Sequence, residues 1–135
     1  MSVDGGLRKL FRTHVRGVHW VTVETGFTTL GVPDSNGCCD GVEFWLEYKF
    51  IKRGWVVGLR PAQVGWLVTR ARHGGRTFIA VRRQADGADR LYIYDGKHAR
   101  ELKDGGMRNA PSLGEWSGGP IGWDWTAVRF ALVLR

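Results

Sequence analysis

The chain has 135 residues, a length typical of one domain that buries a single core without disulfides or a structural metal. Its 43% hydrophobic content and 7 tryptophans exclude an intrinsically disordered chain. Lys and Arg number 20 against 13 Asp and Glu, a formal net charge of +7, and 15 of the basic residues are arginine. Because arginine binds phosphate in bidentate geometry, a polyanionic partner, nucleic acid first, is favoured over a basic surface that only aids solubility.

The two cysteines, Cys38 and Cys39, are adjacent. Neighbouring cysteines rarely bridge, and without a nearby pair of histidines they do not form a zinc site. We therefore expect free thiols in a reducing compartment. No segment approaches the ~20 apolar residues of a membrane span, and the N-terminal stretch has no apolar signal core. These features predict a cytoplasmic protein with no membrane partner (in the host cytoplasm if the chain is viral).

The first predicted elements are a helix and a strand. Apolar residues recur at helical spacing among basic ones near the N-terminus, at Leu7, Leu10, Phe11 and Val15. This pattern indicates a short basic amphipathic helix, with Asp4 as its cap and Gly17 after its end. Residues 18–23, VHWVTV, are β-branched and aromatic and predict a strand. Residues 24–31 then indicate a loop or hairpin return that leads to Val32-Pro33-Asp34.

The clearest predicted strand covers residues 42–51, after a short Gly-rich connection. Its even-numbered residues are apolar and are expected to face the core. Its other face carries Glu43, Trp45, Glu47 and Lys49. A slip of one residue in register would bury these charges, so the alternation should hold the register in place.

The remaining elements alternate between helix and strand. Pro61 begins a predicted helix with an apolar stripe, and Gly74-Gly75 end it. Residues 76–82 and 89–96 are predicted strands, joined by a hairpin at Asp86-Gly87. Residues 97–119 indicate a loop-rich region with a short helical turn, and residues 123–134 either a last strand or a packed helix. The order predicts an α/β fold with one mixed central sheet flanked by helices.

The charged residues on and before the predicted 42–51 strand indicate a catalytic site. Glu47 and Lys49 share a strand face, with Cα atoms ~6.5 Å apart. If residues around Val32 pair antiparallel with this strand, Asp34 returns to Glu47. Two converging carboxylates repel unless a cation lies between them, and hard oxygen ligands suit Mg²⁺ or Mn²⁺. With a lysine alongside, these groups would make a metal-assisted site for phosphodiester hydrolysis.

Two short motifs carry a resemblance to a known family. Val32-Pro33-Asp34 followed by Leu46-Glu47-Tyr48-Lys49 resembles the signature of the PD-(D/E)xK nuclease superfamily. The GVPD lead-in and the later LRPAQVGWL are similar to its VRR-NUC branch, and the Asp-to-Glu spacing resembles that of archaeal-type Holliday junction resolvases. The resemblance covers roughly residues 18–83. It implies a restriction-endonuclease-like core, with residues 1–135 forming a single nuclease domain.

The resemblance also implies a role for each matching residue. Asp34 and Glu47 would coordinate Mg²⁺ or Mn²⁺, the main-chain carbonyl of Tyr48 would be a further metal ligand, and Lys49 would act on the attacking water. Gln63 would lie near the site and contact phosphate or water. Many family members add a glutamate from an early helix, where this chain offers only Asp4. The nearest substitute is Glu24, at the end of the first predicted strand.

Basic residues are expected to bind DNA through backbone phosphates, a contact that is independent of sequence and sensitive to salt. They lie on the first predicted helix and after the 42–51 strand: Arg8, Arg12, Arg16, Lys52, Arg53 and Arg60, with Arg70 and Arg72 extending the surface. Trp55 and Trp116 lie in Gly-rich surroundings, where an indole is able to stack on an exposed base. By analogy with resolvases of similar size, we expect a homodimer, and stand-alone nucleases of this kind are common in phages.

The expected function is that of a Mg²⁺-dependent DNA endonuclease that selects branched or nicked DNA, as a Holliday junction resolvase does. The alternatives are a sequence-specific nuclease of the homing or restriction type and a non-catalytic nucleic-acid-binding module, and RNA remains open as the substrate. Each motif alone also has a structural interpretation, since a Pro-Asp pair often marks a turn and Glu47 with Lys49 would suit a solvated strand face. The four scattered histidines show no ligand spacing and are expected to have local roles.

Overall fold

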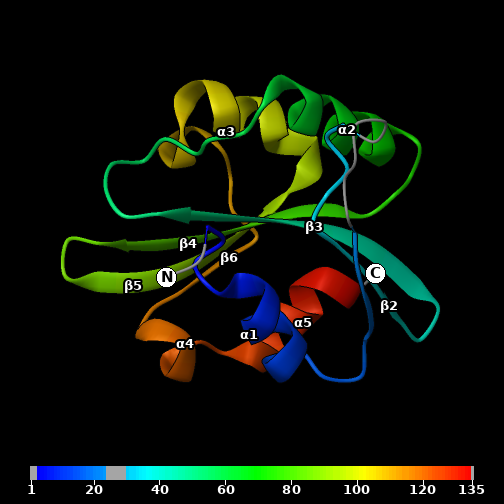
Figure 1. Ribbon diagram of the computed structural model, residues 1–135, viewed down its shortest axis with the longest axis horizontal. Helices are drawn as coiled ribbons and strands as arrows, with labels where there is room; N and C mark the ends of the chain where they lie inside the picture. The colour runs from blue at the N-terminus through cyan, green and yellow to red at the C-terminus, as the bar shows by residue number, and fades with distance from the viewer. Residues whose placement is uncertain (1–2, 24–29, 135) are drawn as a thin grey trace.

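A sheet with strands in chain order separates two layers of helices (Figure 1). The computed structural model describes residues 3–23 and 30–134. Its six strands are β1 (His19–Thr22), β2 (Ser35–Cys39), β3 (Val42–Ile51), β4 (Thr77–Ala85), β5 (Ala88–Asp95) and β6 (Gly114–Trp116). Only β3 and β4 pair in parallel, and the other neighbours are antiparallel. The mixed sheet predicted from the order of elements is therefore confirmed.

The helices divide between the two faces of the sheet. One face is covered by α1 (Leu7–His14), α4 (Gly119–Gly122) and α5 (Trp125–Val133), and the other by α2 (Pro61–Arg72) and α3 (Ala99–Gly105) (Figure 1). Two 3₁₀ turns, η1 (Gly96–His98) and η2 (Met107–Asn109), flank α3. Among the described helices, none is both long and apolar enough to cross a bilayer.

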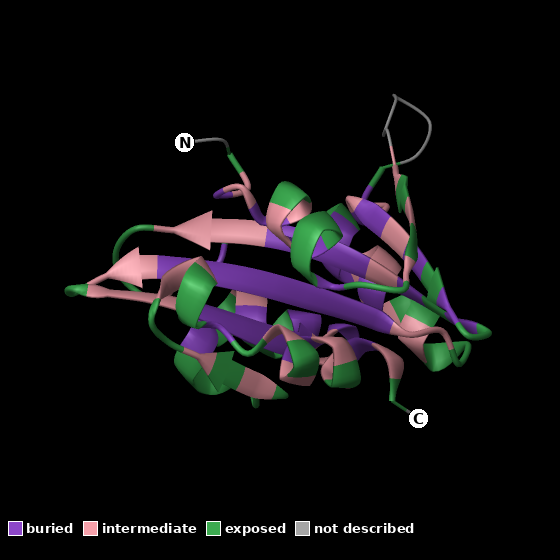
Figure 2. Ribbon diagram, turned by 90° about the horizontal axis from the view of Figure 1, so that it is seen from below, coloured by how far each residue is buried: buried purple, intermediate pink, exposed green. Residues whose placement is uncertain are grey.

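Two hydrophobic clusters fill the space between the sheet and its helices, and β4 contributes to both. Phe78 and Ala80 pack with the residues of α1 and α5, whereas Ile79 and Val81 pack with those of α2 and α3. Because successive side chains of a strand alternate between faces, a strand covered on both sides has a continuous apolar run, which in β4 covers residues 78–81. Figure 2 shows the resulting band of buried strand between the helix layers.

Strand β3 has the predicted bounds, and its apolar face lies where the alternation placed it. Phe44, Leu46 and Tyr48 pack in the cluster beneath α1 and α5. The opposite face is not solvated, however, because α2 lies over its second half, and Glu47 is only 3% exposed. The interpretation of Glu47 as part of a solvated strand face is therefore wrong, because α2 buries this side chain without any slip in register.

Residues 35–39, expected to be a connection, form a strand instead. Strand β2 pairs antiparallel with β1 and with β3, and Asp40-Gly41 makes the tight turn into β3 with φ values of 49° and 78°. An Asp-Gly pair with both φ values positive is typical of a two-residue hairpin. The same signal correctly predicted the hairpin at Asp86-Gly87 and was overlooked here. The strand that returns to β3 thus begins at Ser35, not around Val32.

The last third of the chain is more ordered than its pattern indicated. Residues 97–119, expected to be mostly loop, include α3, η2 and β6, and residues 125–133 form helix α5 rather than a strand. Asp124 caps α5 by accepting from the Ala127 N–H at 3.0 Å. Arg76 closes the other end by donating to the Leu132 and Leu134 carbonyls. Elements this short have too few residues to show a clear period, so tertiary contacts define them.

Two buried arginines of β4 fix the segments on either side of the candidate site. Arg82 forms a bidentate pair with Asp89 and donates to the Gly5 carbonyl at 2.7 Å, which anchors the start of α1. Arg83 donates to the Gly54 carbonyl at 2.7 Å, which anchors the turn after β3. Planar guanidinium groups suit such buried positions because they remain charged while making several hydrogen bonds.

Candidate active site

A polar cleft of about 630 Å³ lies along one edge of β3. The ladder between β2 and β3 ends at the pair Ser35–Leu46, whereas β4 follows β3 as far as Ile51. Residues 47–51 of β3 therefore have one edge without a strand partner in the described part of the chain. The cleft lies at this edge, between the first turns of α1 and α2. Its polar lining residues are Asp4, Arg8, Asp34, Glu47, Lys49, Arg60 and Gln63.

Asp34 lies where β2 ends, and its side chain continues the ladder. Its Oδ2 accepts from the Tyr48 N–H at 2.9 Å, in the place of the next main-chain carbonyl. Its own carbonyl accepts from the Val23 N–H at 2.9 Å, so the residue is held from both sides. The N–H and C=O of one strand residue point to the same edge, so the Tyr48 carbonyl is directed toward Asp34 as well.

The segment before Asp34 is pressed against α2. Gly31 has a φ of 82°, and a Cβ atom there would lie 2.2 Å from the Ala62 carbonyl oxygen. Only glycine fits such a backbone approach in the left-handed region. Pro33 then limits the freedom of the chain as it enters Asp34. The GVPD sequence therefore places the carboxylate beside the first turn of α2.

Glu47 extends from β3 toward α2 into a nearly dry environment. Its Oε2 accepts from Gln63 Nε2 at 2.9 Å and lies 3.5 Å from Lys49 Nζ. Burial, and secondly the negative charge of Asp34, raise the pKa of Glu47 from 4.5 to about 7. The two carboxylates repel one another, and Lys49 beside Glu47 and Arg8 beside Asp34 offset part of this repulsion. A cation bound between the carboxylates would relieve it further.

Lys49 and Gln63 are held in fixed positions by main-chain groups. Lys49 Nζ donates to the Gly58 carbonyl at 2.9 Å and to Gln63 Oε1 at 3.1 Å. The same Oε1 accepts from the Arg60 N–H at 2.9 Å, in the first turn of α2. Two donors facing Oε1 fix the amide so that its NH₂ group points to Glu47. Motif spacing led to Gln63, but nothing in the sequence indicated that Gly58 would contribute its carbonyl.

The donor set suits a small divalent cation. Mg²⁺ is commonly bound by one or two carboxylates while it keeps several waters, and Asp34 and Glu47 offer such a pair. Within the described residues no group of three or more His, Cys, Asp or Glu side chains is arranged to hold a metal. Asp4 also lines the cleft, although its carboxylate accepts from the Gly6 and Arg8 N–H groups at 2.9 and 3.1 Å. Glu24, predicted as the additional acidic residue, lies outside the described residues.

The residues predicted to bind DNA surround the cleft unequally. Arg8 and Arg60 line it, and Arg8 lies 3.9 Å from the Asp34 carboxylate. Lys52 and Arg53 are exposed in the turn that follows β3. Arg12 and Arg16 are exposed farther along α1 and just after it, and Arg12 donates to the Thr22 hydroxyl. Arg70 and Arg72 lie at the other end of α2.

The two tryptophans considered for base stacking have structural roles. Arg83 and Arg108 lie over the Trp55 ring, 3.6 and 4.1 Å from its centre. Two guanidinium groups this close must occupy opposite faces, so Trp55 offers no free face to a base. Trp116 packs against the core on the α5 side and over Gly114. The interpretation of Trp55 as a stacking residue is therefore wrong.

Comparison with known proteins identifies a similar fold. Neither a protein-family model nor a curated protein sequence matches this chain. Among solved structures, it is similar to Hjc, a Holliday junction resolvase from the archaeal hyperthermophile Archaeoglobus fulgidus, with a TM-score of 0.52. The match has 18% sequence identity and covers 91% of this chain and 96% of that one. The resemblance to PD-(D/E)xK nucleases is thus confirmed at the level of the fold, and the chain has the restriction-endonuclease-like α/β fold of this resolvase.

Proposed function

We propose that this chain is a metal-dependent DNA endonuclease that hydrolyses phosphodiester bonds in the cleft beside β3. The observation that carries the proposal is the convergence of Asp34, Glu47, Lys49 and Gln63 on one polar cleft at the free edge of β3. The net charge of +7 and the fold shared with a Holliday junction resolvase support a DNA substrate. Selectivity for branched or nicked DNA follows from the same likeness and from the little room that a small domain has for base contacts.

Asp34 and Glu47 would hold the ion, with the Tyr48 carbonyl as a third oxygen at the same strand edge. A bound Mg²⁺ or Mn²⁺ supplies a Lewis acid for the phosphate and lowers the pKa of a bound water. The raised pKa of Glu47 means that metal binding competes with a proton near neutral pH, so affinity should fall as the pH drops below about 7.

Lys49 is placed to act on the attacking water or on the phosphate. Two of its three N–H donors make hydrogen bonds with described residues, and the contact with Glu47 at 3.5 Å is too long for a good third bond. A water or phosphate oxygen near Glu47 would take that third donor. Gln63 keeps both side chains in place and would itself approach the phosphate.

The backbone of the DNA would lie across the mouth of the cleft. Arg8 and Arg60 flank it, and the first turns of α1 and α2 direct the positive ends of two helix dipoles to the same place. Lys52 and Arg53 would extend the contact on one side, and Arg12 and Arg16 on the other. A homodimer, expected by analogy with resolvases of similar size, would present two such clefts to a junction.

The test is a cleavage assay with Mg²⁺ titrated over linear, nicked, forked and four-way DNA. Wild-type protein should cut only with the metal and should prefer the branched substrates. Asp34→Asn and Glu47→Gln should abolish cleavage while DNA binding is retained. Glu43→Gln is the matched control, because Glu43 lies on the same face of β3 but outside the cleft, and it should cut like the wild type.

Other outcomes separate the alternatives. A single cut in a plasmid would favour the sequence-specific nuclease of the homing or restriction type. Binding in EDTA with no cleavage under any divalent metal would leave a non-catalytic nucleic-acid-binding module and end the proposal. Faster cleavage of the same structures made of RNA would move the substrate class to RNA.

A further inference from the structure

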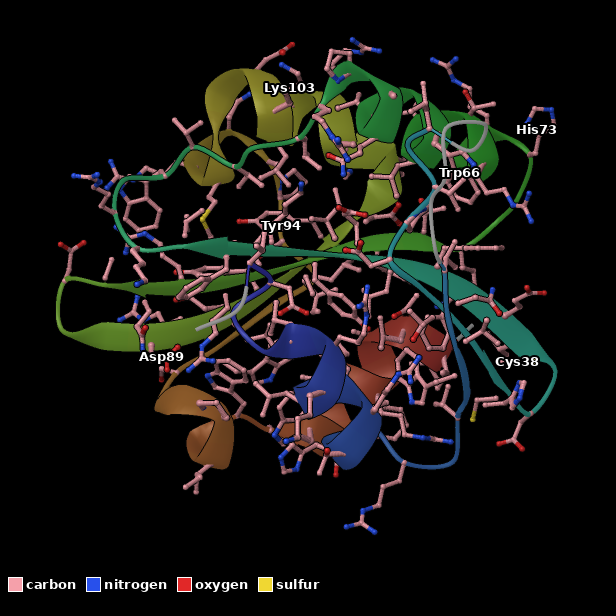
Figure 3. All side chains as sticks on the ribbon, viewed as in Figure 1. Cys38, Trp66, His73, Asp89, Tyr94 and Lys103 are labelled. Atoms are coloured by element: carbon pink, nitrogen blue, oxygen red, sulfur yellow. The ribbon has the colours of Figure 1, made fainter. Side chains whose placement is uncertain are left out.

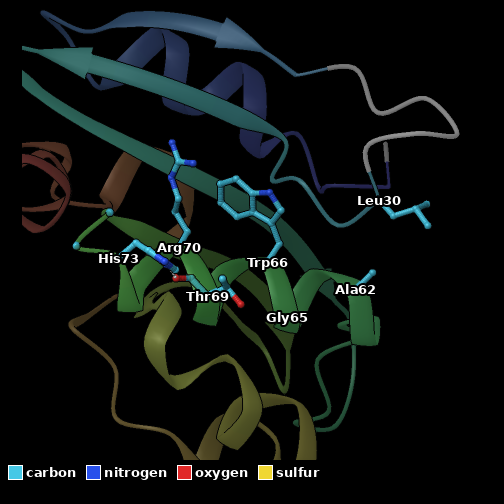
Figure 4. A pocket seen from close by; sticks show the side chains of 9 residues that line it. Leu30, Ala62, Gly65, Trp66, Thr69, Arg70 and His73 are labelled. Carbon is cyan, nitrogen blue, oxygen red and sulfur yellow. Dashed lines mark hydrogen bonds between the residues drawn. The ribbon is translucent and has the colours of Figure 1, made fainter.

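A second and larger concave surface, the α2 groove, runs along helix α2. It has a volume of about 890 Å³ and is lined by the α2 residues Ala62, Gly65, Trp66, Thr69 and Arg70, by the C-cap residue His73 and by Leu30. Figure 4 shows Trp66 and Arg70 rising side by side from α2 toward the sheet, and Figure 3 shows His73 pointing away from the sheet. The groove contains none of the residues of the candidate active site.

The groove contains an aromatic and cationic platform. The rings of Trp66 and Trp45 meet edge to face with centres 5.1 Å apart. The guanidinium group of Arg70 lies over both rings, 5.3 and 5.4 Å from their centres. Arg70 is exposed, and none of the described residues that line the groove is acidic. A planar cation supported by indole rings is a surface on which nucleic acid bases stack.

Gly65 keeps the middle of the groove open. Glycine in the interior of a helix is less stable than alanine, so its presence calls for a reason. Packing supplies none, because a Cβ atom at Gly65 would meet no atom within 4 Å in the described part of the chain. Because Gly65 has no side chain, the space next to Trp66 in the groove stays open.

The α2 groove is continuous in direction with the cleft. Gln63, Trp66, Arg70 and His73 follow one another at helical spacing along α2, and Gln63 is the residue that enters the cleft. From Gln63 to His73 the helix rises about 15 Å, the length of about four nucleotides of a DNA strand. The segment of residues 30–34 crosses α2 at Ala62 between the groove and the cleft, so a strand with a phosphate at Lys49 would pass over this segment to reach Trp66 and Arg70.

We propose that the α2 groove binds an unpaired nucleobase, stacked on Arg70 and Trp66, from the strand that enters the cleft. The identification of that strand as the cleaved one rests on the proposed function, whereas the binding of the base does not. Unpaired bases are present at forks and flaps and absent from intact duplex. The groove thus selects branched DNA without reading its sequence.

The experiment measures binding in EDTA, by fluorescence anisotropy, to two forked DNAs. One carries three unpaired nucleotides next to the branch, and the other carries abasic sites at the same positions, so that the phosphates are identical. Wild-type protein should bind the fork with bases about tenfold more tightly, as expected for the stacking of one base. Arg70→Lys keeps the charge but loses the planar group, and this preference should be lost. Arg100→Lys, an exposed arginine of α3 that does not line the groove, should keep the preference.

Gly65→Leu separates a binding effect from a folding defect. Leucine favours helix more than glycine does, so the variant should melt no lower than the wild type while its side chain fills the groove. The preference for bases should be lost in this variant too. Equal binding of both forks by the wild type, or a full preference in Gly65→Leu, overturns the proposal. A base preference without metal-dependent cleavage would sink the proposed catalysis alone.

Discussion

The two halves of β3 have the same alternating pattern and different surroundings. Residues 42–46 are paired with β2, and β4 joins them only from Trp45 onward. Glu43 on their outward face is exposed and accepts from Asn36 Nδ2 at 2.8 Å. Residues 47–51 are paired with β4 alone, and Glu47 on the same face is buried beneath α2. The two glutamates are four residues apart, yet one is in contact with solvent, whereas burial raises the pKa of the other, Glu47, to about 7.

The difference between the halves comes from the point at which β2 ends. Where β2 continues, its main chain takes the N–H groups of β3. Where it stops, the Asp34 carboxylate takes the Tyr48 N–H instead, and the free strand edge opens into a cleft. Burying a charged side chain costs free energy unless it is paired or hydrogen-bonded. The charged residues of β3 accordingly line the cleft at the edge where a partner strand is missing. In β3 the end of the neighbouring strand is what opens the cleft that contains the candidate site.

The largest expected effect is on cleavage by Lys49→Ala, a change in the half of β3 that is paired with β4 alone. Removing a group that stabilises charge in the transition state should lower kcat about 10²–10³-fold. Single-turnover rates with saturating DNA and Mg²⁺ measure this effect. Lys97→Ala, an exposed lysine outside the cleft, should cut at the wild-type rate. Cleavage by Lys49→Ala at the wild-type rate would show that Lys49 does not stabilise the transition state and would contradict a catalytic role for this half of β3.

The next effect is on stability and concerns Glu47→Gln. Because the pKa of Glu47 is raised from 4.5 to about 7, the folded protein retains a proton that the unfolded chain releases in this range. The stability that comes from this proton is present below pH 4.5 and is lost as the pH rises to about 7. Glutamine mimics the protonated form, so at pH 8 the variant should gain on the order of 2 to 3 kcal/mol over the wild type, relative to their difference at pH 4.

Urea unfolding without divalent metal, at pH values from 4 to 8, measures the Glu47→Gln difference. Added Mg²⁺ should stabilise the wild type at pH 8 more than it stabilises Glu47→Gln. If the difference in unfolding free energy between the wild type and Glu47→Gln stayed constant with pH, the pKa of Glu47 would not be raised in the folded protein.

The smallest effect separates the two roles of Asp34, the hydrogen bond to the Tyr48 N–H and the proposed binding of the metal. Asp34→Asn still offers an oxygen to the Tyr48 N–H, so its unfolding free energy should stay within ~0.5 kcal/mol of the wild type. Asp34→Ala removes the acceptor and should cost about 1 to 2 kcal/mol. Chemical denaturation measures both variants, and both should be unable to cleave. Equal stability of the two variants would argue against the side chain acting as the end of the β2 ladder.

Much of the fold was predictable from local patterns, and the site only in part. The bounds of β3, the start of α2 at Pro61 and the Asp86-Gly87 hairpin all follow from periodicity and turn residues. Strand β2 was missed because SNGCC has weak strand propensity, although the Asp40-Gly41 turn signalled a hairpin. The motif spacing selected Asp34, Glu47, Lys49 and Gln63, but the α2 groove came from none of the motifs and appears only when Trp45 and Trp66 are brought together.

By itself, the sequence determined the alternation of β3, the helix that follows it, and which residue types are available for chemistry. These are properties of neighbouring residues, and backbone geometry sets them within a few positions. Only the tertiary structure decided that Glu47 would be buried, that the Gly58 carbonyl would hold Lys49, and that Arg83 and Arg108 would cover Trp55. Burial and long-range hydrogen bonds depend on which elements pack together, and no local period records that choice.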